Sequence, residues 1–134
     1  MSTNQAAWLA EPLSENFRRS EFACKCGCGF AQPTPLIVEL LQEVRNQYEG
    51  PIHVSSGCRC EAHNRTVGGG KHSQHLTGGA ADIWVDCHFE RLYAIVLDVF
   101  RDHGIGVYLE GAKPGRKRSR LHVDDRGYRA RWTG

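Results

Sequence analysis

Apolar side chains recur every three or four residues in two segments of the chain, which predicts two amphipathic helices. The first begins with Thr34 as the N-cap and Pro35 at the first helical position, and it covers residues 35–48. The second covers residues 89–103 and ends before Gly104. Because each helix has one apolar face, each is expected to pack against another layer of structure.

Short runs rich in β-branched and aromatic residues predict a small sheet. The expected strands are residues 52–55, 80–85, 106–109 and 120–124, and residues 61–67 are expected to form one or two helical turns. Two main helices packed on a small, mostly antiparallel sheet make an α+β architecture, and 134 residues suit a single domain. Residues 1–20 are polar and weakly periodic, so we expect an N-terminal arm there and the folded domain over residues 21–134.

Positive charge is concentrated near the C-terminus, although the formal net charge is only +2. The basic residues of this region are Lys113, Arg116, Lys117, Arg118, Arg120, Arg126, Arg129 and Arg131. Such a run is either a solvated loop or a surface that attracts a polyanion, for example an anionic cell-wall polymer. It lacks the interleaved aromatic residues of a single-strand-binding platform, so nucleic acid is not an expected partner.

The chain has no sequence feature of a membrane protein. No apolar run approaches the length of a membrane span, so stable membrane insertion is not expected. The first eight residues lack the basic and apolar regions of a signal peptide, which predicts synthesis in the cytoplasm without a signal peptide. Action outside the cell would then require another exit route. We expect a monomer.

Five of the six cysteines lie in two closely spaced groups. They are Cys24, Cys26 and Cys28 in the first group and Cys58 and Cys60 in the second. These thiols could hold a structural zinc ion, although the C-x-C spacing is not the usual C-x2-C, or they could form disulfides. The remaining alternative is that they are reduced thiols that act as small apolar residues at turns.

Two imidazoles and one carboxylate suggest a catalytic metal site. His75 and Asp82 lie in the segment 73–82, and His122 lies in the expected strand 120–124. Such a set leaves the fourth position of a zinc ion open for a water molecule, whose pKa then falls toward neutrality. Taken singly, Asp82 could instead pair with an arginine, and His122 could be a core histidine bonded to a backbone carbonyl.

Asp124 is the residue next to His122 on the same face of its expected strand. At this spacing its carboxylate could orient the His122 ring, or it could act on a metal-bound water.

The pattern Ser73-x-His75-x-x-Gly78-x-Ala80-x-Asp82, followed by His122, resembles the M15 zinc peptidases. This group contains D-alanyl-D-alanine carboxypeptidases and peptidoglycan endopeptidases. Segment 55–64 is similar to the S-G-x-R stretch of that family, and segment 17–24 is similar to the opening of its phage-associated and bacterial members. The resemblance covers residues 17–127.

The resemblance implies Zn²⁺ held by His75, Asp82 and His122. It also implies that Arg59 neutralises a substrate carboxylate or carbonyl, for which a planar fork of donors is suited, and that Ser73 bonds the substrate or a ligand. The expected function is hydrolysis of peptide bonds in the stem peptides of bacterial peptidoglycan, as a carboxypeptidase or an endopeptidase. A phage or prophage lysis enzyme, or a virion component, would fit this activity.

One position departs from the family pattern. Several members place the catalytic acid three residues before the last histidine, and here that residue is Ser119, which cannot act as a base. Asp124 is our first candidate for this role and Glu110 the second. A chain without a competent base could instead be a non-catalytic, zinc-bearing module that binds the cell wall.

Overall fold

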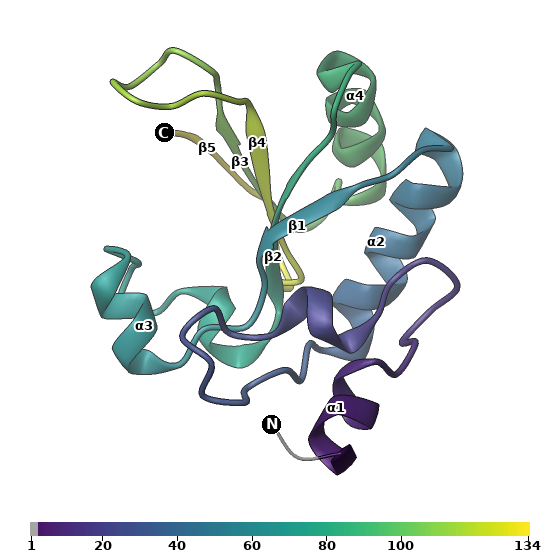
Figure 1. Cartoon of the computed structure of the whole chain (residues 1–134). Coiled ribbons are helices and arrows are strands. Elements are labelled where there is room, and N and C mark those ends of the chain that lie inside the picture. The colour runs from purple at the N-terminus through teal and green to yellow at the C-terminus, as the bar shows by residue number, and fades with distance from the viewer. Residues whose placement is uncertain (1–2) are drawn as a thin grey trace.

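A five-stranded sheet is the centre of the computed structural model, which describes residues 3–134 (Figure 1). Its strands are β1 (His53–Ser56), β2 (Ala80–Trp84), β3 (Gly104–Tyr108), β4 (Arg120–Asp124) and β5 (Ala130–Thr133). Their spatial order is β1-β2-β4-β3-β5. All neighbouring strands are antiparallel except β3 and β5, which are parallel. The predicted α+β fold with a mostly antiparallel sheet is therefore confirmed.

Two long helices, α2 (Pro35–Tyr48) and α4 (Phe89–Val99), lie side by side along one side of the sheet (Figure 1). Helix α2 begins as expected, because the Thr34 hydroxyl accepts the backbone N–H of Ile37 at 3.2 Å. Helix α4 ends four residues earlier than predicted. Its C-cap is Phe100, whose side chain is fully buried, and the chain turns there to enter β3 at Gly104.

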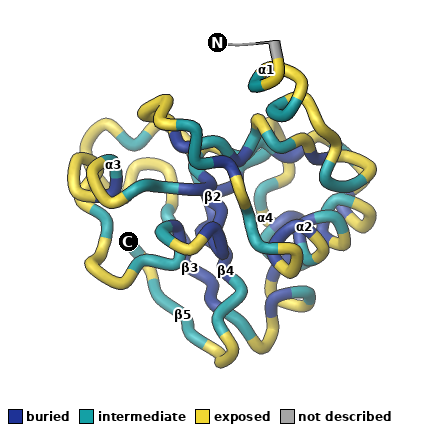
Figure 2. Tube along the Cα trace, turned by 90° about the horizontal axis from the view of Figure 1, so that it is seen from below, coloured by how far each residue is buried: buried dark blue, intermediate teal, exposed yellow. Residues whose placement is uncertain are grey.

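The two faces of the sheet differ in chemistry, as the alternation of side chains requires. The apolar residues of β2 and β4 that face the helices are fully buried, for example Ile83 and Leu121. Asp82, His122 and Asp124 alternate with them and point to the opposite face. The short helix α3 (Glu61–Thr66) lies across the sheet from α2 and α4 (Figures 1 and 2), and the short helix η2 (Gln74–Thr77) contacts both α3 and β2.

The segment expected to be an N-terminal arm contributes to the core. It contains helix α1 (Thr3–Leu9), and the short helix η1 (Arg19–Phe22) follows. The Phe17 side chain is 1% exposed, and its ring centre lies 6.0 Å from that of the fully buried Phe22. The packed core therefore begins before residue 20. None of the helices within residues 3–134 is long and apolar enough to cross a membrane.

Candidate metal centre

The structure brings together the three residues that the sequence predicts to be metal ligands. His75 lies in η2, Asp82 in β2 and His122 in β4, where the backbones of Asp82 and His122 are direct cross-strand partners. The Oδ1 atom of Asp82 lies 3.4 Å from Nε2 of His75 and 3.1 Å from Nδ1 of His122. One ligand atom from each residue falls within 4.8 Å of the other two, which is close enough for one ion to bind all three.

The tautomer of His75 suits a metal ligand. Its Nδ1 lies 2.6 Å from the carbonyl oxygen of Gly57, so Nδ1–H donates there and the lone pair is on Nε2. This Nε2 atom is buried and has no hydrogen-bond partner among the described residues. It lies 3.4 Å from Oδ1 of Asp82, and a cation between these two electron-rich atoms would satisfy both. The residues present therefore fit a divalent metal ion.

His122 is oriented by Asp124. Nε2 of the ring donates to Oδ2 of Asp124 at 2.8 Å, which leaves the lone pair on Nδ1, the atom that faces Asp82. Asp124 is fully buried and also accepts two bonds of 2.8 Å from Arg126. Burial alone would raise the pKa of Asp124, but the bonds from His122 and Arg126 hold this pKa well below its usual range. Asp124 thus remains ionised and contacts the edge of the ring that faces away from Asp82.

Two glycines of β3 make room for these side chains. Gly104 pairs with Asp124 and Gly106 with His122 across the β3–β4 ladder. A Cβ atom at Gly104 would collide with the Asp124 carboxylate, and one at Gly106 would collide with the indole of Trp132. The sequence assigns Gly104 only to the end of the second helix and gives Gly106 no role. Their role could have been recognised from the sequence, because glycine within a strand often marks the close approach of another group.

Arg59 supports the opposite side of Asp82. Its guanidinium donates to Oδ2 of Asp82 at 3.1 Å, to Ser56 at 2.9 Å and to Asn64 at 3.3 Å. Burial would raise the pKa of Asp82, but in the metal-free protein contacts with the His122 and His75 rings, when these rings carry the donating proton, hold this pKa well below its usual range. Ser73, the other predicted substrate contact, caps η2 by accepting the backbone N–H of His75 at 3.2 Å. Both residues line the cleft in front of the ligands.

The metal centre opens into a cleft of about 450 Å³. Its cationic lining residues are Arg59, Lys113, Arg116, Arg120 and Arg126. Within residues 3–134, Asp82 is the only acidic side chain among the residues that line it. The cleft is therefore suited to an anionic ligand.

Glu110 lies outside this cleft. It is exposed on the loop after β3, where its backbone N–H donates to Ser119 Oγ at 3.0 Å, and it lines a separate hollow with Trp84 and Arg118. Glu110 is therefore not among the residues that line the cleft of the metal centre. Its role as second candidate for the base stays a prediction.

The five closely spaced cysteines do not form a single group in the structure. Cys24, Cys26, Cys28 and Cys60 form one cluster, whereas Cys58 is buried in the hydrophobic core. All the cysteines of the chain are free thiols in the structure.

Two imidazoles and a carboxylate at the base of an open cleft are typical of the metal centre of a hydrolase. Residues 15–124 match the family described as Peptidase M15, so the chain belongs to the M15 peptidase family. The membership confirms the resemblance seen in the sequence and makes the chain a member of a family of metallopeptidases. A comparison with curated proteins gives no match.

Proposed function

We propose that this protein is a zinc peptidase that hydrolyses peptide bonds in the stem peptides of bacterial peptidoglycan. The observation that carries the proposal is the convergence of Nε2 of His75, Oδ1 of Asp82 and Nδ1 of His122 at the base of the basic cleft. Two neutral imidazoles with one carboxylate are a ligand set that zinc accepts readily. When bound in such a site, zinc polarises a carbonyl oxygen and lowers the pKa of a coordinated water.

The charge of the cleft supports a substrate that carries carboxylates. Arg116 and Arg120 line it, each with its guanidinium over the ring of Tyr108, at 5.3 and 4.4 Å from the ring centre. A stem peptide with a free terminal or side-chain carboxylate would be attracted to these cations. Residues 68–70 are glycines on the rim of the cleft and offer no side chains to obstruct an extended peptide.

Arg59 has a different role in this proposal from that of Arg116 and Arg120. Its three hydrogen bonds fix the guanidinium against Asp82, so it orients that ligand while Arg59 also lines the cleft. A substrate carbonyl or carboxylate would meet a cation that is already positioned, and little side-chain entropy would be lost on binding. Ser73, which caps η2, would contact the same substrate.

Asp124 fits a positioning role better than that of a base. Its oxygens are occupied by His122 and Arg126, and the residue is fully buried. It holds His122 in the neutral tautomer whose Nδ1 lone pair is directed toward Asp82. Proton transfer would then depend on a group brought by the substrate or by a movement of the cleft residues.

A second function is favoured by one specific observation. Because Asp82 is the only acidic lining residue in the described part of the chain, the cleft holds no free carboxylate for proton transfer. A non-catalytic, zinc-bearing module that binds the cell wall would need none. For either function we propose action on the cell wall, in a phage or prophage lysis system or in a virion.

Incubation of the purified protein with isolated peptidoglycan separates these functions. A peptidase releases alanine if it trims a terminal D-Ala, or creates new amine termini if it cuts within the stem, and mass spectrometry of the fragments identifies the bond. The His75→Ala variant, which removes one ligand, should release neither product. Sedimentation with the peptidoglycan, without any new product from the zinc-loaded wild-type protein, would reject the peptidase and support the binding module.

A further inference from the structure

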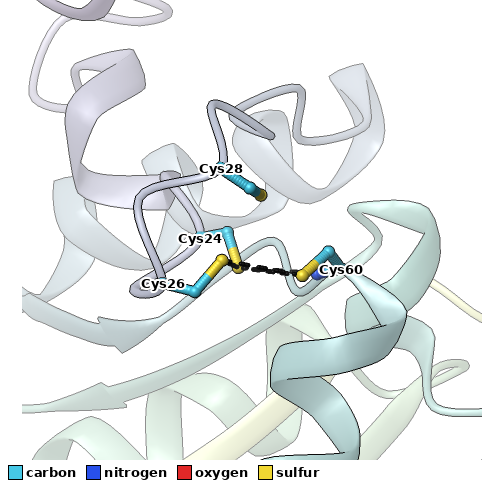
Figure 3. A group of neighbouring side chains, drawn as sticks. All are labelled: Cys24, Cys26, Cys28 and Cys60. Atoms are coloured by element: carbon cyan, nitrogen blue, oxygen red, sulfur yellow. Dashed lines mark hydrogen bonds between the residues drawn. The ribbon is translucent and has the colours of Figure 1, made fainter. Parts of the chain in front are cut away.

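Figure 3 shows a second group of metal-ligating side chains, none of which lines the cleft. Cys24, Cys26 and Cys28 come from the loop between η1 and α2, and Cys60 comes from the N-cap position of α3. The sulfur atoms of these residues all lie within 4.8 Å of one another. They come from segments that are more than thirty residues apart in the sequence, so the fold itself assembles this cluster.

The distances between the sulfurs are those of a tetrahedral site. Sγ of Cys24 lies 3.5 Å from Sγ of Cys26 and 3.9 Å from Sγ of Cys60, and Cys26 and Cys60 are 3.6 Å apart. A tetrahedron with Zn–S bonds of about 2.3 Å has S···S edges of about 3.8 Å. A disulfide, by contrast, has sulfurs about 2.0 Å apart and would use two of the four thiols.

The local backbone is shaped to point these sulfurs at one centre. Gly27 and Gly29 have φ values of +82° and +96°, in the left-handed region that glycine adopts without strain. Gly27 lies between Cys26 and Cys28, and Gly29 follows Cys28, so a left-handed residue stands on each side of the third thiol of the loop. The loop is closed by a hydrogen bond of 2.8 Å from the backbone N–H of Cys24 to the Phe30 carbonyl.

Backbone N–H groups are also directed at the sulfurs. The N–H of Cys60 donates to Sγ of Cys24 at 3.5 Å, and the N–H of His63 donates to Sγ of Cys60 at 3.4 Å. The second bond lies at the N-terminus of α3. Such donors stabilise a thiolate, which is the form of cysteine that binds a metal.

We propose that Cys24, Cys26, Cys28 and Cys60 bind a structural zinc ion, distinct from the ion at His75, Asp82 and His122. All four protein ligands are present, so this site is closed, as structural zinc sites are. Each thiol releases its proton to solvent when the ion binds. Cys58 is excluded from the site, because its side chain is 1% exposed and packs in the hydrophobic core.

The position of the cluster indicates what the ion stabilises. Cys60 directly follows segment 57–59, which supports the ligands of the first metal centre. The Gly57 carbonyl fixes the His75 ring, and the backbone N–H of Arg59 donates to the His75 carbonyl at 3.0 Å. A zinc ion that ties Cys60 to the loop 24–28 would hold this segment in place. It would therefore rigidify the metal centre from outside.

Metal analysis of the purified full-length protein tests this inference. The wild-type protein, prepared under reducing conditions with zinc, should contain about two zinc ions per chain, given one closed and one open site. The double variant Cys26→Ser/Cys28→Ser should contain one fewer. Cys26 and Cys28 are both exposed, so their replacement removes ligands without leaving a cavity in the core. Cys87→Ser, which changes another exposed thiol, is the matched control and should retain both ions.

Cobalt substitution identifies the ligands independently of activity and of the proposed function. The cobalt-loaded His75→Ala variant should keep an intense thiolate-to-cobalt charge-transfer absorption, and adding the two serine substitutions should abolish it. If the double variant does not fold, the same absorption can be followed in the otherwise intact His75→Ala protein. The inference is overturned if that protein shows no thiolate absorption. It is overturned equally if native peptide mapping under non-reducing conditions finds Cys24, Cys26, Cys28 or Cys60 in a disulfide.

Discussion

Asp124 and His122 form a buried pair in which the carboxylate fixes the tautomer of the ring. The Nε2–H group of His122 donates to Asp124 Oδ2 at 2.8 Å, so Nδ1 is the nitrogen left for a metal ion. Loss of such a carboxylate partner weakens metal binding about 10–100-fold in metalloproteins. Asp124→Asn should therefore weaken zinc binding by this factor, as measured by competition with a chelator.

Asp125→Asn is the control for this variant, because Asp125 is the sequence neighbour and its carboxylate bonds Thr34 instead of His122. It should leave the zinc affinity unchanged. If Asp124→Asn instead keeps the zinc affinity of the wild-type protein but loses most of its hydrolysis, Asp124 acts as the base.

Gly104 should be sensitive to substitution although its backbone is not strained. A methyl group there would collide with the Asp124 carboxylate, which cannot move freely because Arg126 and His122 hold it. We expect Gly104→Ala to lower the free energy of unfolding by about 1–3 kcal/mol, the usual cost of overpacking a core, and to weaken zinc binding. Gly127→Ala is the control, since a methyl group at that position would have no neighbouring atom within 4 Å. Equal denaturation midpoints for the two variants would contradict the expectation.

Most of the elements could be predicted from local sequence patterns, and the resemblance to the M15 peptidases pointed to the three residues that the structure brings together. The spacing of apolar residues is enough for α2 and α4, and alternation places Asp82 and His122 on one face. Strand β5 was not predicted. It is short and mostly half-exposed, and it is paired in parallel with β3, which is more than twenty residues away. Such a strand forms mainly because it pairs with its neighbour β3, and its own pattern of apolar and polar residues contributes less.

The contacts that surround the metal ligands depend on strand β5, which the sequence did not predict, and on the burial of Asp124. Trp132 of β5 packs with its ring centre 5.1 Å from that of His122, over Gly106. The sequence could place Asp124 beside His122, but it could not show that the carboxylate would be fully buried and bonded to Arg126. Because Asp124 is buried, it can orient the His122 ring but cannot contact a substrate in the cleft.

Zinc binding at the His75, Asp82 and His122 site should weaken as the pH falls. Burial alone would lower the pKa of His122, but its bonds to Asp124 and Asp82 outweigh this effect and raise the pKa above the usual value for histidine. In the metal-free protein, a proton therefore competes with zinc for His122 at every pH below this raised pKa, and the competition disappears above it. The zinc affinity should fall by up to about tenfold for each pH unit below that pKa.

Chelator competition at a series of pH values, in the Cys26→Ser/Cys28→Ser background, measures this affinity without a contribution from the cysteine cluster. Asp124→Asn removes one of the bonds that raise the pKa of His122, so the fall in affinity should begin at a lower pH in that variant. An affinity that does not change between about pH 6 and pH 8, the range in which histidines usually titrate, would contradict the prediction.

Arg59 and Arg120 both line the cleft, yet their substitution should affect different quantities. Arg59 bonds Ser56, Asn64 and Asp82 at once, which a lysine cannot do because its ammonium is a point charge. Arg59→Lys should therefore lower kcat/KM and also weaken zinc binding through Asp82. Arg120 contacts the ring of Tyr108 and no metal ligand in the described contacts, so Arg120→Ala should leave zinc binding unchanged and raise KM for a carboxylate-bearing peptide. That rise should shrink at high salt, because the attraction is screened. Zinc binding that is unchanged in Arg59→Lys would show that Arg59 serves the substrate alone.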